Sequence, residues 1–399
     1  NAGTLEDVKA NGHVKCGIST GVPGFAFTDE KGNWQGFDPA VCQGVAAAVL
    51  GDSSKVKYTT TTGKTRFTVL RSGQVDMLAR NTTWTFSRDT DLQLTFVGVN
   101  YYDGQGFMVP KSLGVKSAKE LDGASVCIQT GTTTELNLAD FFRVNNIKYE
   151  PVPIETNQEA RTNYAAGRCD VYTTDASGLA ATRTTFEKPD DHVVLPEIIS
   201  KEPLGPLVRH GDDQWGDIVR WVLNAMIVAE ELGVTSKNVD EMKAKSTNSE
   251  VRRLLGVEGK FGEMMGIGND WAYNIVKQVG NYGESYERTV GMGSPLKLKR
   301  GRVYGKVRES FFVRYVANEL AQDPDFGSVA VRAGGRDNPA THHYLAVTLE
   351  RTGQPKRARK HFRIAARLDP KTWFVPVRTP EDGFAALVEE AFNGLSPQI

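Results

Sequence analysis

The sequence has no net charge, no C-x-x-C cysteine pair and no apolar run of membrane-spanning length. Its 399 residues include 48 Lys plus Arg and 48 Asp plus Glu, so no overall basic field attracts nucleic acid or a membrane surface. No stretch approaches the roughly 18 to 20 apolar residues that a spanning helix needs. We therefore expect neither a nucleic-acid partner nor insertion into a membrane.

Recognisable catalytic and cofactor motifs are also missing. The chain contains no H-E-x-x-H, no P-loop and no G-x-G-x-x-G after a strand. The histidines all fall outside the polar loops described below: His13, His192, His210, His342, His343 and His361. The sequence therefore predicts a protein that is not an enzyme and that holds neither a metal nor a cofactor.

The four cysteines are placed so that two disulfides are possible. Cys16 lies in an expected strand and Cys42 on the alanine-rich helix after it, whereas Cys127 and Cys169 lie in two later strands. Pairing them in that order keeps each bridge inside one structural unit, and such loops stabilise a fold by roughly 3.5 to 4 kcal/mol each. The alternative is four buried free thiols. Disulfides favour an oxidising compartment such as a bacterial periplasm.

The start of the chain fits that location. It begins at Asn1 without a charged and hydrophobic leader, which is expected of an exported protein whose signal peptide has been removed. A cytosolic protein would show the same start. We expect a periplasmic location on the strength of the cysteines.

Strands and helices alternate twice along the chain. Residues 15–89 and 123–175 each follow the pattern strand, helix, strand, helix, strand, which is typical of parallel sheets covered by helices. The segments after them, 101–109 and 196–208, carry several Gly and Pro and are predicted as hinge strands that cross between two lobes.

The chain is then expected to return to the first lobe through helices such as 213–232, whose apolar residues recur at helical spacing. The predicted fold is therefore α/β and two-lobed. Lobe 1 is expected to comprise residues 1–104 and 205–301, and lobe 2 residues 105–204. Residues 302–399 are expected to form a separate, all-α extension.

Three polar segments follow predicted strands and offer complementary groups. V-D-M-L-A-R-N-T-T-W-T-F-S-R-D supplies the cation Arg88, Q-T-G-T-T-T-E supplies a helix start with free backbone N–H groups, and C-D-V-Y-T-T-D supplies the carboxylate Asp175. Ligands of open α/β sheets bind beyond the carboxyl ends of the strands, where these segments lie. Together they can hold a carboxylate at one end of a ligand and an ammonium at the other, which is the shape of a free α-amino acid.

Several segments carry a family resemblance over about residues 5–301: GNWQGFDPAVCQGVAAAV, SGQVDMLARNTTWTFSRDT, VNYYDGQGFMV, GASVCIQTGTTTELNLADFF, GRCDVYTTDASGL and KPDDHVVLPEIISKEPLGP. They resemble the periplasmic general L-amino-acid binding proteins of ABC importers (solute-binding protein family 3). The resemblance implies a two-lobed type II periplasmic binding fold that closes on a free L-amino acid with broad specificity. It also implies an inner-membrane ABC permease, powered by an ATPase, as the partner that receives the ligand.

The resemblance assigns roles to individual residues. Arg88 would grip the ligand α-carboxylate, helped by the backbone N–H groups of Thr83 and Thr132, and Asp175 would pair with the ammonium. Further contacts would come from Gly131 in the same loop as Thr132, from Asn81 beside the ammonium, and from Phe25, Lys64 and Trp84 as walls of the side-chain pocket.

Structural roles compete with these assignments. Arg88 could belong to a structural ion pair, and Asp175 could cap the helix that follows it. Thr132 and Glu135 have the spacing of a capping box, which is compatible with ligand contact. Of the three residues assigned to the pocket wall, Phe25 and Trp84 could instead be core side chains, and Lys64 could be a solvated surface charge.

Two other functions remain as alternatives. The same fold carries lyases and peptidoglycan-cleaving enzymes, which need a positioned acid or base. Alternatively, the C-terminal extension could make the chain an interaction scaffold. Residues 338–370 resemble one tetratricopeptide repeat, with its apolar and small residues on two helices joined by a turn.

One repeat cannot bury its face alone. Helices over 309–321 and 382–392 are therefore expected to cap it, and a protein partner is possible for this region. The join near Arg300 could also be a fusion or a frame error.

Overall fold

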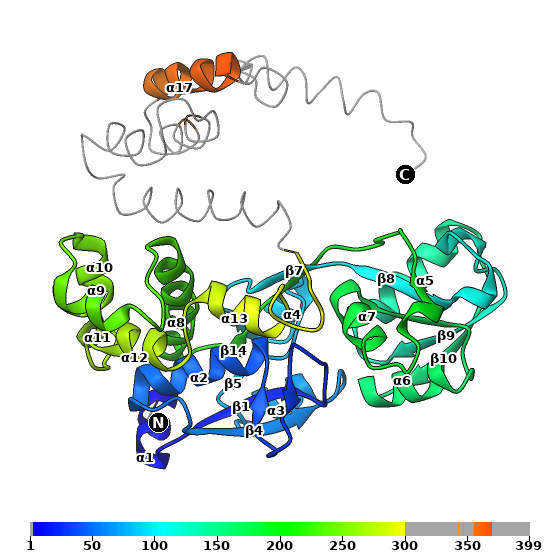
Figure 1. The fold of residues 1–399 in the computed structure, drawn as a ribbon, viewed down its shortest axis with the longest axis horizontal. Coiled ribbons are helices and arrows are strands. Elements are labelled where there is room, and N and C mark those ends of the chain that lie inside the picture. Colours follow the sequence, from blue (N-terminus) through cyan, green and yellow to red (C-terminus); the bar gives the residue numbers. More distant parts are fainter. Residues whose placement is uncertain (1–2, 300–341, 343–345, 347–354, 369–399) are drawn as a thin grey trace. The chain divides into compact units, whose positions relative to one another are not determined.

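The structure is a computed structural model that describes residues 3–299, His342, Ala346 and residues 355–368. The chain divides into two compact units, Asn1–Lys299 and Arg300–Ile399 (Figure 1). In the described residues no helix combines the length and apolar character needed to span a bilayer.

The first sheet of the larger unit has the strand order β4-β1-β5-β14-β6. Strand β1 runs parallel to β4 and β5, whereas β14 is antiparallel to β5 and β6. The chain therefore leaves this sheet after β6 and returns to it more than a hundred residues later, as predicted. The strands are β1 (Val14–Ser19), β4 (Val56–Thr61), β5 (Met77–Leu78), β6 (Leu94–Phe96) and β14 (Leu207–Arg209).

Helices cover this sheet, and we call the sheet with its helices lobe 1. Helix α2 is buried on most sides because it packs against β1, α8 and α12, which explains its alanine-rich and valine-rich sequence. The helix predicted over 213–232 is α8, and its recurring apolar residues are buried. The helices are α1 (Thr4–Asn11), α2 (Phe37–Leu50), α3 (Arg66–Arg71), α4 (Phe86–Thr90), α8 (Asp213–Glu231), α9 (Val239–Lys245), α10 (Ser249–Leu254), α11 (Phe261–Met264), α12 (Trp271–Gln278) and α13 (Tyr282–Thr289); a small hairpin joins β2 (Phe27–Thr28) to β3 (Trp34–Gln35).

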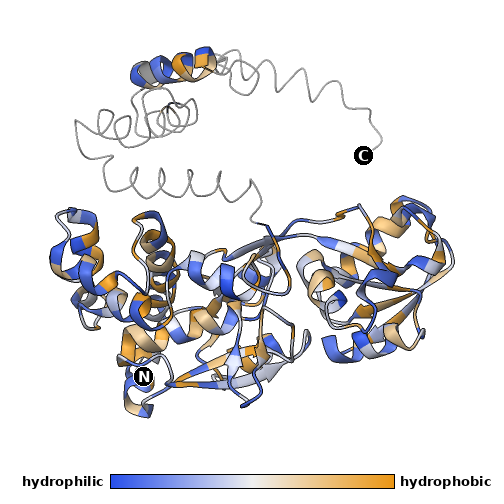
Figure 2. Cartoon of the chain, viewed as in Figure 1, coloured by the Kyte–Doolittle hydropathy of each residue, from blue (hydrophilic) through white to orange (hydrophobic). Residues whose placement is uncertain are grey.

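The second sheet has the order β10-β9-β11-β8-β12, with β9 parallel to β10 and β11, and β8 antiparallel to β11 and β12. Its strands carry stretches of hydrophobic residues (Figure 2), which are buried together with hydrophobic residues of its helices, and we call this assembly lobe 2. The elements are β8 (Gln105–Pro110), β9 (Ala124–Gln129), β10 (Tyr149–Ile154), β11 (Val171–Asp175), β12 (His192–Val194), α5 (Thr133–Val144), α6 (Asn157–Ala165), α7 (Ala176–Arg183) and the 3-10 turns η1 (Lys111–Leu113), η2 (Ala118–Glu120) and η3 (Pro189–Asp191).

Two short antiparallel strands connect the lobes: β7 (Tyr101–Asp103) and β13 (Glu202–Leu204), with Glu202 opposite Asp103. The predicted hinge segments were longer than this pair. The segment 101–109 continues directly into β8 of lobe 2, and 196–208 continues into β14 of lobe 1. The sequence therefore predicted where the chain crosses between the lobes. The content of Gly and Pro could not predict where each short hinge strand ends and the following sheet strand begins.

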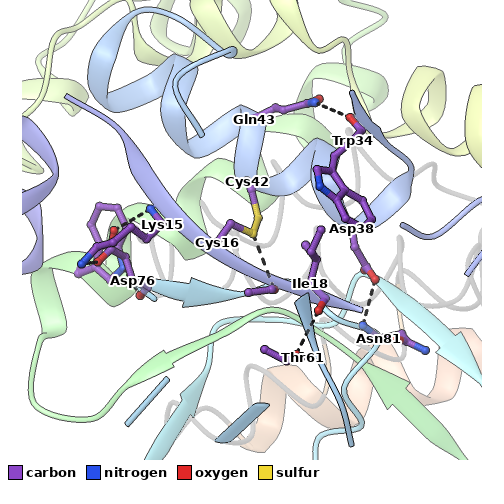
Figure 3. Close-up of a disulfide and its surroundings, with 12 residues drawn as sticks. Lys15, Cys16, Ile18, Trp34, Asp38, Cys42, Gln43, Thr61, Asp76 and Asn81 are labelled. Atoms are coloured by element: carbon purple, nitrogen blue, oxygen red, sulfur yellow. Dashed lines mark hydrogen bonds and ion pairs between the residues drawn. A yellow bond between two sulfur atoms is a disulfide. The ribbon is translucent and has the colours of Figure 1, made fainter. Parts of the chain in front are cut away.

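Both predicted cysteine pairs are disulfide-bonded in the structure. Cys16 on β1 is joined to Cys42 on α2 with a Cα–Cα distance of 6.3 Å (Figure 3). Cys127 on β9 is joined to Cys169, just before β11, with a Cα–Cα distance of 5.6 Å. Each bridge therefore lies within one lobe.

In the smaller unit the structure describes α17 (Pro355–Leu368), which contains the second helix of the predicted repeat. Ala358, Phe362 and Ala365 are buried along one side of α17, whereas its arginines alternate with them and are exposed. Of the first predicted helix, His342 and Ala346 are helical and buried. The capping helices predicted over 309–321 and 382–392 lie outside the described residues.

Candidate functional site

The two lobes touch where a loop after β4 meets the loop after β9. A Cβ atom added to Gly63 would lie 2.7 Å from the carbonyl oxygen of Thr130, and one added to Gly131 would lie 3.0 Å from Cγ of Lys64. Gly131 also has a φ of +70°, which favours glycine. The Lys64 ammonium faces the carboxylate of Glu155 at 3.8 Å, in an exposed pair that contributes little to stability. Gly131 and Lys64 therefore lie at the junction between the lobes.

A single buried carboxylate, Glu202 on hinge strand β13, joins both lobes at this junction. Its Oε2 accepts hydrogen bonds from the hydroxyl of Thr83 in lobe 1 and, at 3.0 Å, from the hydroxyl of Thr133 in lobe 2. Its Oε1 accepts from Nδ2 of Asn137 at 2.8 Å and from the Ser200 hydroxyl at 2.6 Å. This carboxylate is 1% exposed and is fully hydrogen-bonded.

Arg88 lies on the short helix α4 and is 7% exposed. Its Nη1 donates to the carbonyl oxygen of Thr83 at 2.9 Å, and its guanidinium lies 5.2 Å from the centre of the Phe67 ring. Burial lowers its pKa to about 10, so it remains charged at neutral pH. Within the described residues no carboxylate forms an ion pair with Arg88, so the structural ion pair considered above is absent.

The start of α5 presents backbone N–H groups. Thr132 is its N-cap, because the Thr132 hydroxyl accepts from the backbone N–H of Glu135 at 3.3 Å. The Glu135 carboxylate returns to the N–H of Gly131 at 2.9 Å rather than to that of Thr132, so the predicted capping box is only half formed. Among the described residues, the backbone N–H groups of Thr83 and Thr132 have no acceptor. Both are free to bind an anion.

Asp175 ends β11 and is 8% exposed. Its side chain makes no capping hydrogen bond to α7, so the alternative role as a helix cap is not realised. Burial raises its pKa well above the usual value, and the charges of Asp103 and Glu202 raise it further, whereas Arg66 and Arg80 oppose the shift. A buried carboxylate in this state is stabilised by any cation that reaches it.

Asn81 has a backbone φ of +32°, which is uncommon for a residue other than glycine. Its backbone N–H donates to Oδ2 of Asp38 at 3.1 Å (Figure 3), and Asp38 lies in the first turn of α2. The Asn81 Oδ1 atom is buried and has no partner among the described residues, so it can accept a hydrogen bond. The structure therefore keeps Asn81 available as a second contact for an ammonium.

The two predicted aromatic wall residues differ in their surroundings. Trp84 is partly exposed, and its ring stacks on Phe96 with centroids 5.4 Å apart. Phe25 is buried and packs edge to face against Phe37 and Tyr101 in the core of lobe 1. These contacts match the core role considered for Phe25.

Two buried arginines were not singled out by the sequence. Arg66 is the first residue of α3, and its Nη1 donates to the hydroxyl of Thr82 at 3.2 Å. Arg80 follows β5, and its Nε donates to the carbonyl oxygen of Thr61 at 3.3 Å. Burial lowers the pKa of both groups, and each also feels the charge of Arg88. Lobe 1 thus brings three buried guanidinium groups together.

Sequence signals for these residues were uneven. Arg80 lies in the same polar segment as Arg88 and follows β5, so the strand-end rule that identified Asp175 could also have identified it. Arg66 lies two residues after Lys64, which the resemblance placed in the pocket wall, but nothing in that segment indicates that the arginine is buried. Nothing marks Glu202, because a charged residue after Lys201 in a predicted hinge is usually solvated.

The arrangement is suited to a ligand with opposite charges at its two ends. Guanidinium groups lie on the lobe 1 side, and the carboxylate of Asp175 lies on the lobe 2 side. In the described part of the chain, no group of three or more His, Cys, Asp or Glu side chains could hold a metal ion.

Known proteins show similarity to the same region. The model of the family described as bacterial extracellular solute-binding proteins, family 3, matches residues 14–238. The chain is 60% identical over 301 residues to the glutamate/glutamine/aspartate/asparagine-binding protein BztA of Rhodobacter capsulatus, covering 75% of this chain and 89% of that protein.

Two further relatives agree with this match. The general L-amino acid-binding periplasmic protein AapJ of Rhizobium johnstonii is 60% identical over 303 residues, with coverage of 75% of this chain and 89% of that protein. A solved structure of a periplasmic binding protein of an ABC transporter from Brucella ovis, with glutathione bound, is 56% identical, with a TM-score of 0.73 and coverage of 75% of this chain and 95% of that chain.

Proposed function

The chain belongs to family 3 of the bacterial extracellular solute-binding proteins, and we propose that it binds free L-amino acids between its lobes and delivers them to an inner-membrane ABC permease. Its fold is the two-lobed type II periplasmic binding protein fold. Relatives at 60% identity are named as amino-acid-binding proteins, which supports a binding protein rather than an enzyme.

One observation carries the proposal: a buried arginine of lobe 1 lies within reach of the charge of a buried aspartate of lobe 2, and neither has an ion-pair partner among the described residues. In the proposal, Arg88 binds the ligand α-carboxylate through two parallel charge-assisted hydrogen bonds. The backbone N–H groups of Thr83 and Thr132 complete that cradle. Asp175 binds the ammonium, with Oδ1 of Asn81 as a second acceptor.

The division into lobes follows from the hinge. Residues 1–104 with 205–301 would form one rigid body and 105–204 the other, with β7 and β13 as the connection. Lys64 and Gly131 would then belong to the surfaces that meet when the lobes close. Trp84 would contribute to the wall of the pocket.

We also propose a periplasmic location after removal of a signal peptide. The two disulfides support an oxidising compartment. The name of the relative from Rhizobium johnstonii, a periplasmic protein, supports the same location.

For the smaller unit we propose a tetratricopeptide-like repeat over residues 338–370 that binds a protein partner. The support comes from α17, where the small residue Ala358 and the large residue Phe362 are buried on one side. Small and large apolar residues at helical spacing are what a helix of such a repeat presents to its neighbour.

The proposal is tested by calorimetry with a panel of the standard amino acids on the wild type, Arg88→Ala and Asp175→Asn. The wild type is expected to bind with roughly micromolar affinity, near −8 kcal/mol. Each variant should lose about 2 to 5 kcal/mol for every ligand, because one buried charge of the pair is left without its partner.

Arg143→Ala is the matched control, since Arg143 is an exposed arginine on α5 that pairs with Asp140. Unchanged binding by a folded Arg88→Ala variant would contradict the carboxylate assignment. Product detected by mass spectrometry would favour the enzyme alternative. Loss of all activity on deletion of residues 302–399, with Arg88→Ala still active, would favour the scaffold.

A further inference from the structure

A zwitterionic amino acid needs one cation and one carboxylate from the protein, and lobe 1 contains more cations than that. If Arg88 and Asp175 hold the α-carboxylate and the ammonium, Arg66 and Arg80 are left over. Arg66 is 2% exposed and Arg80 is 3% exposed. Burying a guanidinium group without a counter-charge is costly, so two such residues call for a physical explanation.

Both leftover guanidinium groups have hydrogen-bonding atoms that nothing satisfies. The Nε atom of Arg66 and the Nη2 atom of Arg80 are buried and have no partner in the described part of the chain. The partners that they do have are neutral, namely the Thr82 hydroxyl and the Thr61 carbonyl oxygen. Buried donors of this kind are rare in folded proteins, and a charged donor without an acceptor destabilises the fold.

Further unsatisfied groups lie at the same sheet edge. Ser19 ends β1 directly beside Thr61 of β4, and the Ser19 hydroxyl is buried without a partner. The hydroxyl of Thr20, the next residue, is in the same state. Because β1 lies between β4 and β5, these hydroxyls share the carboxyl edge of the sheet with Arg80, which follows β5.

The carboxylates near these arginines are occupied elsewhere. Glu202 accepts four hydrogen bonds from neutral side chains. Asp38 accepts the backbone N–H of Asn81 and forms no ion pair with Arg80 within the described residues. The third, Asp175, is assigned to the ammonium. Asp38, Asp175 and Glu202 therefore act on Arg66 and Arg80 through their charge alone, and among the described residues no carboxylate forms an ion pair with either guanidinium group.

We propose that Arg66 and Arg80, with the hydroxyl of Ser19, form a second anion subsite that binds the side-chain carboxylate of a dicarboxylic amino acid. This inference rests on the proposed function, because it assumes that Arg88 and Asp175 hold the α-amino acid group. A carboxylate accepts hydrogen bonds at both oxygens and supplies the missing negative charge. An amide places an NH₂ group against donors, and an aliphatic side chain leaves every donor unpaired, so both should bind less well.

The first test compares glutamate, glutamine and leucine by calorimetry at pH 7 on the full chain, because glutamate and glutamine differ only in the group that reaches the subsite. The wild type should bind glutamate at least about tenfold more tightly than glutamine, and leucine more weakly still. In Arg66→Met and Arg80→Met the preference for glutamate over glutamine should fall to about threefold or less.

The outcomes separate this inference from the proposed function. Equal affinities of the wild type for glutamate and glutamine, both lost in Arg88→Ala, would overturn the second subsite and leave the proposed function intact. An unchanged preference in folded Arg66→Met and Arg80→Met variants would do the same. Absence of binding to any amino acid would overturn both.

A second measurement needs no variant, which matters if replacing a buried arginine unfolds the chain. Glutamate labelled with ¹³C at its side-chain carboxyl carbon is titrated in complex with the wild type and followed by NMR. Free glutamate titrates with a pKa of about 4.3. The bound carboxyl should remain ionised at least one pH unit lower, because two guanidinium groups stabilise the charge. A bound pKa at or above the free value would overturn the subsite.

Discussion

Replacing Asp38 by asparagine should stabilise the protein, and the gain should grow as the pH rises. Asp38 lies in the first turn of α2 and is 2% exposed. Burial raises its pKa from 3.8 to about 7, although the N–H of Asn81 and the charge of Arg80 act in the opposite direction. Asparagine has nearly the same shape and keeps an oxygen that can accept the Asn81 N–H.

The sign and size follow from linkage. The folded state binds the Asp38 proton more tightly than the unfolded state, so ionisation of this carboxyl costs stability. The cost is absent below the unfolded pKa of about 3.8, grows as the pH rises, and is complete above the folded pKa of about 7. A difference of roughly 3 pKa units corresponds to about 4 kcal/mol at 1.36 kcal/mol per unit.

The assay is urea unfolding of the wild type and Asp38→Asn from pH 4 to pH 8. The two should have similar stability near pH 4, and the variant should gain up to about 4 kcal/mol relative to the wild type by pH 8. Asp140→Asn, which removes an exposed carboxylate on α5, is the control and should show no such trend. A difference that narrows with rising pH would refute the reasoning, since it would mean that Asp38 is ionised and stabilised by Arg80.

Two further predictions concern the junction and the disulfides. Glu202→Gln should weaken the binding of glutamate and of leucine in calorimetry by a similar free energy, about 1.5 to 3 kcal/mol. The reason is that the variant loses charged hydrogen bonds that join the lobes rather than contacts to one ligand side chain. An effect on one ligand alone would argue against this role. Replacing Cys127 and Cys169 by serine should lower the unfolding free energy by about 4 kcal/mol, because that bridge spans 42 residues. The same replacement of Cys16 and Cys42 should lower it by about 3.5 kcal/mol, because that bridge spans 26 residues. Unaltered urea midpoints would contradict both values.

The sequence predicted the two sheets and both cysteine pairs because these features depend on local patterns. Apolar strands alternate with amphipathic or alanine-rich helices, and the periodic apolar residues of α8 marked that segment as a helix with a buried face. Strand ends also pointed to Arg88 and Asp175, since the carboxyl ends of parallel strands share one edge of a sheet. Both residues are buried near the lobe junction.

The remaining site residues depend on contacts between distant segments. Thr83 and Glu202 are 119 positions apart and meet only because β13 passes between the lobes. Likewise, the burial of Arg66 depends on the packing of α3 against the first sheet, and no single-residue pattern distinguishes it from a surface arginine at a helix start. Long-range burial of charge is therefore the part of this site that sequence patterns could not predict.

The distribution of charge over the two lobes gives a reason why ligand binding and lobe contact should be coupled. The cations Arg66, Arg80 and Arg88 all belong to lobe 1, whereas Asp175 belongs to lobe 2. With the lobes in contact these groups are removed from water, yet none of them forms an ion pair among the described residues. A ligand that carries a carboxylate towards lobe 1 and an ammonium towards lobe 2 offsets both desolvation costs at once. We infer that such a ligand favours the state in which the lobes meet, because only there does it reach both sets of charges.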